Sequence, residues 1–297
     1  MEFRQLEIFL EVAEQKSFSL AAEKLHLSQS TISTQIISLE QELKTELIHR
    51  TTRSFNLTDA GIKLYTYAAD LISLKKRAQS EISQSTKKTV QIGTSSVPSV
   101  CIVPNLIYEF GKKYPNICYE IIEDSSIQII DMVSSGKLDL GFVGTKVEHE
   151  QLCYTPILND ELVLVTPNKP PYNKQKTKIS KENLIEYPFL MRNHSSGTTK
   201  EALYILSRLG ISENDLKIIA KMNNIEILQQ CIIEGLGVSI LSKNTVSHWV
   251  ECGKILTFEL EKSPSFRQLY MVFRKSRYTP QMIKLFAQFT KQKYKTL

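Results

Sequence analysis

The stretch AAEKLHLSQSTISTQIISLEQEL, residues 21–43, decides the fold of the N-terminal part of the chain. It holds two helical patterns that meet at a turn around His26. The two alanines that open the stretch are small enough to let a second helix pack closely, and Ser19 is placed to cap the helix that carries them. We therefore predict a helix-turn-helix over residues 18–39.

The second helix of this pair is expected to run from Gln29 to Leu39 or a little beyond, with Ser28 as its N-cap. Ile32, Ile36 and Leu39 form its apolar stripe. The opposite face has short hydroxyl and amide side chains, which can hydrogen-bond to base edges and phosphates in a major groove. These residues are Gln29, Ser30, Thr31, Ser33, Thr34 and Gln35. On this helix alone, an ordinary solvent-facing surface explains the same residues equally well.

A second stretch, LIHRTTRSFNLTDAG at residues 47–61, follows the predicted helix pair. Arg50 and Arg53 lie three residues apart in a segment rich in Thr and Ser, and Phe55 and Leu57 then alternate with polar residues. This pattern predicts a short β-wing with two cations placed for phosphate contacts beside a groove. Each arginine taken singly would be an ordinary surface charge.

Together, the two stretches resemble the winged helix-turn-helix of the LysR-type transcriptional regulators. The resemblance implies that the second helix faces double-stranded DNA and that the two wing arginines contact its backbone or minor groove. The residues implied to bind DNA are Ser28, Gln29, Thr31, Ser33, Thr34, Gln35, Arg50 and Arg53. Many members carry arginines on this helix, whereas here no charge lies between Ser28 and Leu39. Phosphate contacts are therefore expected to depend on the wing, on Lys44 and on backbone N–H groups.

Residues 58–87 form one long helical pattern that Thr58 can cap. Its apolar positions follow spacings of four and three residues, as in a coiled coil of about three heptads. They are Ala60, Leu64, Tyr67, Leu71, Leu74 and Ala78. A helix that packs on its own domain would give a similar pattern. The resemblance favours dimerisation, because LysR-type proteins dimerise through this helix, and it leaves homodimer and homotetramer open.

Length and composition fit a globular protein of two or three compact units, with 297 residues, 42% apolar and 23% charged residues. The net charge is +6, yet residues 1–88 contain 12 Lys+Arg against 11 Asp+Glu, a net of +1. Charge therefore does not single out the N-terminus as the DNA-binding part. Since no long apolar run or secretory signal is present, we expect a cytoplasmic protein with no membrane partner.

From Thr89 onward, short β-rich runs alternate with helical segments, which indicates an α/β region. The order β-α-β-α-β up to Val143 predicts a right-handed, mostly parallel sheet, with a helix from about Val103 to Tyr114. Ligands bind outside the carboxyl ends of such strands. Two predicted strand ends are polar, at Thr94-Ser95-Ser96 and at Gly144-Thr145. Simple helix capping would also explain these hydroxyl groups.

A second α/β unit begins near Glu161, and its strand at residues 189–191 runs into the loop Arg192–Thr198. Free N–H groups at the start of a helix and an arginine together suit an anion. Crossings near Leu162 and Gln268 predict two hinged subdomains with a cleft between them. The residues expected to hold an effector are Ser95, Ser96, Thr145, Arg192, Ser196, Thr198 and Asn223.

This C-terminal region resembles the effector-binding domain of the same family, which is built like periplasmic solute-binding proteins. GKLDLGFVG at 136–144 and IIEGLGVSILS at 232–242 carry the resemblance. RNHSSGT at 192–198, with Ser242, is similar to the branch that includes the CysL, YeiE and CbbR regulators. The resemblance implies a small anionic effector, such as a sulfur or selenium oxyanion or a small carboxylate, and RNA polymerase as a partner.

The expected domains are a winged helix-turn-helix at 1–58, a linker helix at 59–87 and an α/β effector-binding domain at 88–297. Within the last, subdomain I covers about 88–161 and 267–297, and subdomain II about 162–266.

Two other protein classes fit parts of the sequence: a solute-binding transport protein, and an α/β enzyme acting on a small anion. The sequence holds no GxSxG, P-loop, GxGxxG after a strand or HExxH motif, so no enzyme, cofactor or metal site is predicted. The five histidines do not cluster, and only His194 falls in the predicted cleft. The five cysteines are odd in number and lack CxxC spacing, which favours buried, reduced thiols.

Overall fold

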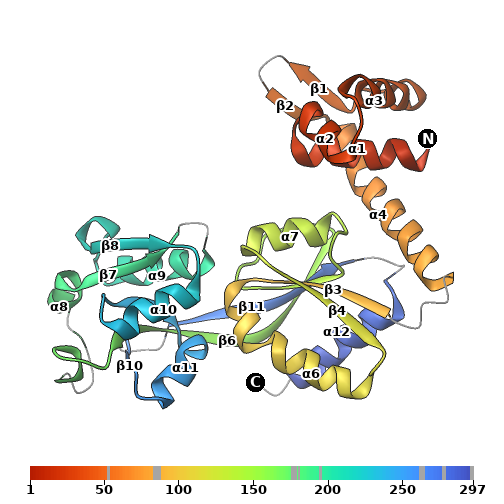
Figure 1. Cartoon of the computed structure of the whole chain (residues 1–297). Coiled ribbons are helices and arrows are strands. Elements are labelled where there is room, and N and C mark those ends of the chain that lie inside the picture. Colours follow the sequence, from red (N-terminus) through yellow and green to blue (C-terminus); the bar gives the residue numbers. More distant parts are fainter. Residues whose placement is uncertain are drawn as a thin grey trace. The chain divides into compact units, whose positions relative to one another are not determined.

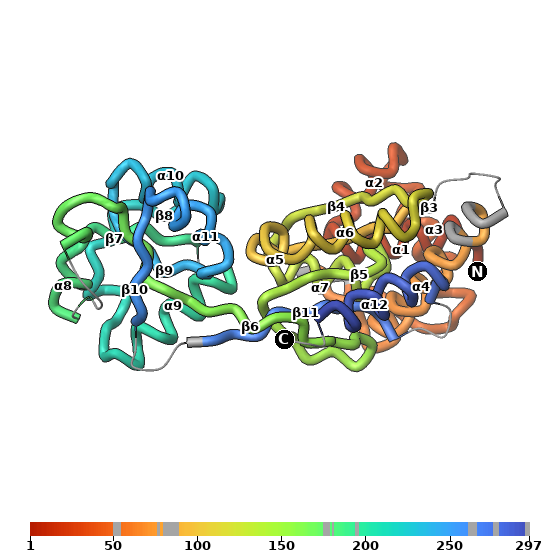
Figure 2. The backbone as a smooth tube through the Cα atoms, turned by 90° about the horizontal axis from the view of Figure 1, so that it is seen from below, coloured from red at the N-terminus to blue at the C-terminus, as the bar shows by residue number. Residues whose placement is uncertain are grey.

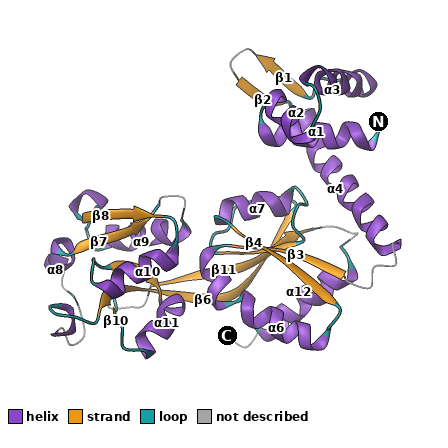
Figure 3. Cartoon of the chain, in the orientation of Figure 1, coloured by secondary structure: helices purple, strands orange, loops and turns teal. Residues whose placement is uncertain are grey.

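The computed structural model describes residues 1–51, 54–82, 88–174, 179, 181–193, 196–260, 265–275 and 279–294. The chain divides into two compact units, one of residues 1–87 with 134–137 and one of residues 88–133 with 138–297 (Figure 1). The first unit is helical with a two-stranded hairpin, and the second is α/β (Figure 3).

The N-terminal unit contains four helices and one hairpin among its described residues. They are α1 (Phe3–Gln15), α2 (Phe18–Leu25), α3 (Gln29–Leu43), β1 (Ile48–Thr51), β2 (Ser54–Leu57) and α4 (Asp59–Ile82). β1 and β2 pair antiparallel, with Arg50 opposite Phe55. The predicted helix-turn-helix is therefore α2 and α3, and the predicted wing is the β1–β2 hairpin.

The caps of α2 and α3 decide where the turn lies. The cap predicted at Ser19 is wrong, because Ser17 has the extended backbone of an N-cap and its hydroxyl accepts the Leu20 N–H at 3.3 Å. His26 ends α2 in the left-handed conformation. The Ser28 cap is confirmed, since its hydroxyl accepts the Thr31 N–H at 3.1 Å.

One hydrophobic cluster holds these helices together. Ala21 and Ala22 are buried where α2 faces α3, and the predicted stripe of α3 is fully buried. Burial of each large aliphatic side chain stabilises the unit by roughly 1.5–3 kcal/mol. The cluster consists of Leu6, Ile8, Phe9, Val12, Ala21, Ala22, Ile32, Ile36, Leu39, Leu47, Ile48, Ala68 and Ile72.

The first turn of α4 is joined to the wing by the hydroxyl of Thr58. This hydroxyl donates to the Glu46 carbonyl at 2.7 Å and accepts the Gly61 N–H at 2.9 Å, which confirms Thr58 as a cap. Gly61 lies so close to the wing that a Cβ there would be 2.1 Å from the Leu47 carbonyl oxygen. The start of α4 is therefore fixed against the wing by backbone contact.

The predicted apolar positions of α4 divide between two faces. Ala60, Leu64 and Leu71 pack on the core of their own unit, next to buried Ala68 and Ile72. The remaining positions, Tyr67, Leu74 and Ala78, are exposed, with Tyr67 at 66%. The first set fits a helix that packs on its own domain, and dimerisation through the second, exposed set stays a prediction.

The second unit contains two subdomains that share one sheet. Subdomain I consists of β3 (Lys88–Thr94), α5 (Ser96–Cys101), α6 (Val103–Lys113), β4 (Ile117–Glu123), α7 (Ser126–Ser134), β5 (Leu140–Val143) and α12 (Gln281–Lys293). Subdomain II consists of α8 (Lys181–Glu186), β7 (Pro188–Arg192), α9 (Gly197–Arg208), β8 (Lys217–Met222), α10 (Ile225–Glu234), β9 (Ser239–Ser242), α11 (Lys243–Glu251) and β10 (Ile255–Phe258), with short 3₁₀ turns at Tyr172–Lys174 and Glu213–Asp215.

Two long strands join the subdomains: β6 (Leu152–Pro167) and β11 (Ser265–Arg274). They pair antiparallel over most of their length and lie side by side in Figure 2. The crossings predicted near Leu162 and Gln268 fall on these strands. Paired backbone hydrogen bonds in both strands make this connection a two-stranded hinge.

The described strands form a mixed sheet in the order β10-β6-β11-β5-β3-β4, with β9 added on β6. β3 pairs parallel with β4 and β5, as predicted. Beyond these three strands, to which the prediction applied, the β6 and β11 crossings bring antiparallel pairs, so the sheet as a whole is mixed. In the second, smaller sheet, β7 pairs parallel with β8. No helix in the described part of the chain is both long and apolar enough to cross a bilayer.

Candidate functional site

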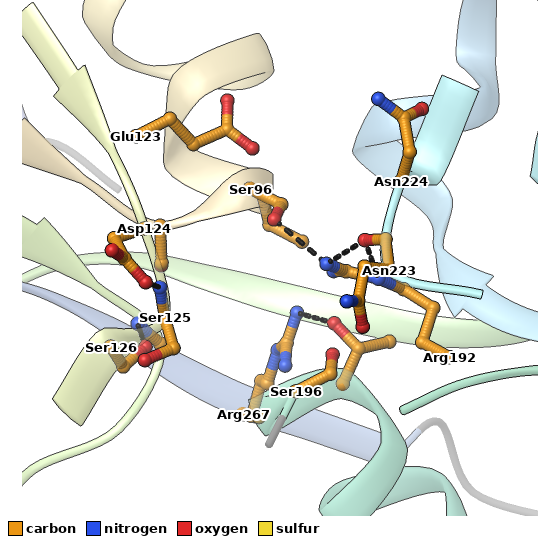
Figure 4. A pocket seen from close by; sticks show the side chains of 15 residues that line it. Ser96, Glu123, Asp124, Ser125, Ser126, Arg192, Ser196, Asn223, Asn224 and Arg267 are labelled. Carbon is orange, nitrogen blue, oxygen red and sulfur yellow. Dashed lines mark hydrogen bonds between the residues drawn. The ribbon is translucent and has the colours of Figure 1, made fainter. Parts of the chain in front are cut away.

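A cavity of about 340 Å³ lies where the carboxyl ends of the parallel strands of both subdomains meet (Figure 4). β3 and β4 bring one wall to it, and β7 and β8 bring the other. Its volume is in the range of small-molecule sites. The lining residues are Ser95, Ser96, Val97, Glu123, Asp124, Ser125, Ser126, Gly144, Arg192, Ser196, Gly197, Thr198, Asn223, Asn224 and Arg267.

Arg192, at the end of β7, is held in place across the cavity. Its Nε and Nη2 donate to the Asn223 carbonyl oxygen at 3.2 and 2.7 Å, and Nη2 also donates to the Ser96 hydroxyl at 3.0 Å. Burial lowers the pKa of Arg192, and the nearby Glu123 carboxylate partly offsets this effect. The guanidinium group thus links the two subdomains while it faces the cavity.

A second arginine, Arg267 of β11, reaches the cavity from the hinge strands. Its Nε donates to Oδ2 of Asp160 at 2.9 Å, and Nη2 donates to the Thr198 hydroxyl at 3.1 Å. Asp160, on β6, is 0% exposed and also accepts from the Ser242 hydroxyl and from Asn244 Nδ2. A buried ion pair with this many hydrogen bonds keeps its side chains in one arrangement.

The start of α9 offers unused hydrogen-bonding groups to the cavity. Ser196 is the N-cap of α9 by position, yet its hydroxyl makes no cap hydrogen bond. The residue is only 9% exposed, and no described residue is a hydrogen-bond partner of its Oγ. A buried hydroxyl without a partner is costly, and this one lies on the cavity wall, where a ligand could supply the missing hydrogen bond. The N–H groups of the first turn of α9 add positive potential there.

Six of the seven effector residues predicted from the sequence line this cavity, and Thr145 does not. Instead, its hydroxyl lies next to Gly197, 3.0 Å from where a Cβ of that glycine would be. His194 and Ser195 of the predicted loop lie outside the described residues. The sequence interpretation missed Arg267, although the alternation along β11 contained the signal. Arg267 is in phase with Leu269 and Met271, which are fully buried.

The predicted DNA-binding residues differ in how far they face solvent. Gln29, Thr31 and Thr34 are exposed on α3, whereas Ser33 and Gln35 are half-buried on its flanks. The exposed stripe also includes Ser30, which belongs to the predicted polar face, and Ile37 and Ser38, which do not. The Ser28 hydroxyl already caps the helix and contacts the Ser30 and Thr31 hydroxyls.

Of the two predicted wing arginines, Arg50 lies on β1, and Arg53 lies outside the described residues.

The cysteines are free thiols, but the prediction that they are buried is wrong, because none of the five is fully buried. Cys118 and Cys252 are exposed, and the other three are partly buried. Burial raises the pKa of the Cys101 thiol to about 12, so it is protonated and unreactive at neutral pH. Among the described residues, no group of three or more His, Cys, Asp or Glu side chains could hold a metal ion.

Comparison with known families identifies the family to which the helical N-terminal unit and the α/β unit belong. Residues 3–62 match the family described as "Bacterial regulatory helix-turn-helix protein, lysR family", and residues 83–295 match "LysR substrate binding domain". The chain belongs to the LysR family. This LysR protein is thus a DNA-binding transcriptional regulator with an effector-binding domain, which argues against the transport-protein alternative.

Individual relatives agree with the family assignment. A protein of Cyanidioschyzon merolae, described as a probable RuBisCO transcriptional regulator, is 31% identical over 92% of this chain and 92% of its own length. This description agrees with the resemblance to the CbbR type. A full-length OxyR variant of Pseudomonas aeruginosa has the same fold, with a TM-score of 0.67, 21% identity and coverage of 98% of this chain and 95% of its own. The CcmR regulatory domain of Synechocystis PCC6803, in complex with 2-PG, has a TM-score of 0.63 and 22% identity, and it covers 70% of this chain and 98% of its own length.

Proposed function

We propose that this LysR regulator is controlled by a small organic or inorganic anion bound in the cavity between its two subdomains. The observation that carries the proposal is the buried Ser196 hydroxyl, which has no partner among the described residues and faces the same cavity as two guanidinium groups. Ligand oxygens would complete the hydrogen bonds of Ser196 and of the first turn of α9. The CcmR domain, which shares this fold, is described in complex with 2-PG, also an anion.

The proposed effector acts through the hinge formed by β6 and β11. An anion that contacts Arg192 from subdomain II and Ser95 or Ser96 from subdomain I would favour the closed arrangement of the two. A ligand shifts such an equilibrium only by its difference in affinity for the two states. We infer that closure changes how paired chains pack, and hence the DNA bend and RNA polymerase recruitment.

Changing Ser196 to alanine tests the proposed cavity. A screen of phosphate, sulfate, sulfite, selenite and small carboxylates by thermal shift on the full chain would first identify a stabilising anion. We expect Ser196→Ala to weaken its binding about tenfold, the effect of one hydrogen bond to a charged group. The unliganded melting temperature should stay the same or rise, because a buried unsatisfied hydroxyl is removed.

Ser207→Ala is the matched control for this change, since Ser207 also lies on α9 and its exposed hydroxyl donates to the Tyr204 carbonyl away from the cavity. It should leave anion affinity unchanged. Equal affinity of the Ser196→Ala variant and the parent chain would count against the cavity as the effector site.

We propose that α3 contacts base edges mainly through the exposed side chains of its first two turns, Gln29, Thr31 and Thr34. Gln29 is the strongest candidate, because an amide can make a bidentate contact with adenine. Since α3 lacks charge before Glu40, its contacts would contribute specificity more than electrostatic affinity. Two copies of the chain, joined through exposed Tyr67 and Leu74 of α4, would bind two half-sites of one operator. The proposed place of action is the cytoplasm, where the chromosome lies.

Gln29→Ala separates base contacts from phosphate contacts. We expect operator affinity to fall about tenfold, with non-specific DNA binding and the salt slope of binding unchanged. Fluorescence anisotropy at several salt concentrations, with operator and random DNA, measures both quantities. Gln41→Ala, at the exposed far end of α3, should change neither. A parallel loss of affinity for operator and random DNA would instead indicate a phosphate contact at Gln29.

A further inference from the structure

The charged groups on the cavity wall are of both signs. Within the described residues, they are Arg192 and Arg267 on the one hand and Glu123 and Asp124 on the other. Figure 4 shows Glu123 and Asp124 on one side of the cavity and Arg192 across from them. The formal charges of the lining therefore sum to zero.

The two arginines are not equally available to a ligand. Arg267 already forms a buried ion pair with Asp160, so its positive charge is largely neutralised inside the protein. Arg192 makes no salt bridge among the described residues, and its hydrogen bonds go to neutral oxygens of Ser96 and Asn223, while the nearby Glu123 carboxylate acts on its charge through space. The Arg192 charge, together with the N-terminus of α9, thus faces the ligand on this side.

The two acidic residues also differ. Asp124 lies just before α7, and its Oδ1 accepts the Ser125 N–H at 2.6 Å, so its charge stabilises a helix start. No described residue donates a hydrogen bond to the carboxylate of Glu123, which is exposed at the end of β4 and lines the cavity. Its carboxylate is therefore the acidic group on the described wall to which no described residue donates a hydrogen bond.

The cavity is also larger than a single oxyanion requires. A volume of 340 Å³ would hold on the order of ten water molecules, at about 30 Å³ each. A tetrahedral oxyanion at Arg192 and Ser196 would leave the space beside Glu123 filled with water. A longer ligand can use both ends of the site.

We propose that the effector is zwitterionic, with its anionic group at Arg192, Ser196 and the start of α9, and an ammonium group at Glu123. This rests on the proposed function of the cavity as the effector site and narrows its ligand class. A ligand with a second negative charge at its far end would meet the Glu123 carboxylate and bind more weakly.

Two phosphate monoesters of similar length test this proposal, because they differ in the charge of the far group. Phosphoethanolamine ends in an ammonium group, and 2-phosphoglycolate ends in a carboxylate. Calorimetric titration of the full-length protein should give at least tenfold tighter binding of phosphoethanolamine. Glu123→Gln should reduce this ratio about tenfold, by weakening phosphoethanolamine and strengthening 2-phosphoglycolate. Glu120→Gln, the same charge change on the same strand but outside the cavity lining, should leave the ratio unchanged.

The outcomes separate the two levels of the proposal. If 2-phosphoglycolate binds as tightly as phosphoethanolamine or more tightly, the zwitterion inference is wrong, while the anion site stands. The inference is also wrong if Glu123→Gln leaves the ratio unchanged. If neither ester binds at millimolar concentration, the zwitterion inference is wrong, and the anion site is wrong as well if every anion of the thermal-shift screen also fails to bind.

Discussion

Replacing Arg267 with methionine is expected to lower the free energy of unfolding of the effector-binding unit by about 3–5 kcal/mol. Methionine fills a similar length of space, so the change removes charge and hydrogen bonds with little loss of volume. The loss leaves the Asp160 carboxylate, which is 0% exposed, without its ion-pair partner. Hydrogen bonds from Ser242 and Asn244 remain, but they bring no compensating charge.

The measurement is chemical denaturation of the parent chain and the variant, with tryptophan fluorescence as the signal. Trp249 lies on α11, the helix that follows Ser242, so its emission reports on the affected region. The double variant Arg267→Met, Asp160→Asn is the control, because removal of both charges leaves no unpaired carboxylate. It should recover most of the lost stability.

Effector binding provides a second measurement, which separates a loss of folding stability from a loss of effector affinity. Arg267 lines the cavity and holds the Thr198 hydroxyl at the start of α9. The double variant should therefore fold normally and still bind the effector poorly. If the single variant Arg267→Met is as stable as the parent chain, the buried Asp160 carboxylate does not need the Arg267 charge for the stability of the fold. A double variant with full effector affinity would show that Arg267 does not take part in effector binding.

Gly61→Ala is expected to destabilise the N-terminal unit by roughly 3 kcal/mol, the upper end of overpacking costs. A Cβ at this position would lie 2.1 Å from the Leu47 carbonyl oxygen and 3.3 Å from the Leu57 Cβ. The oxygen belongs to the backbone, so no side-chain rotation relieves the clash. α4 would have to move away from the wing, and the hydrogen bond from the Thr58 hydroxyl to the Glu46 carbonyl would break.

Operator binding should fall more than tenfold in this variant, because the wing and α4 no longer hold a common position. Gly111→Ala is the matched control, a glycine in α6 whose Cβ would meet only the Tyr119 hydroxyl at 3.8 Å. Replacing a mid-helix glycine with alanine should stabilise that helix by about 0.5–1 kcal/mol. Circular dichroism melts and DNA-binding titrations of both variants check the two expectations. A normal melt for Gly61→Ala would contradict the close contact.

Local features of the fold were largely predictable from the sequence. The stripe of Ile32, Ile36 and Leu39 and the cap at Ser28 place α3 correctly, because helical period and capping depend on residues close in the chain. The cap of α2 was misplaced by two residues, since both Ser17 and Ser19 have a suitable hydroxyl. Only the backbone conformation distinguishes them.

The effector cavity was predictable in outline, because strand ends in parallel α/β sheets gather at one edge. The positions of the charged groups in this cavity were not predictable from the sequence. Glu123 sits at the end of a strand and Arg267 within one, so neither belongs to a loop motif that attracts attention. Thr145 was included because it also follows a strand, yet it is not part of the cavity lining.

The helix-turn-helix, the wing and the alternation of strands and helices were thus determined by the sequence itself, through patterns that repeat every few residues. Tertiary structure alone decided which charges meet. Arg267 contacts Asp160 from 107 residues away and Thr198 from 69 residues away. Such contacts arise only when β6 and β11 pair and α9 docks beside them. The physical reason is that periodicity records which face of an element is buried, while a long-range ion pair depends on where the folded chain returns.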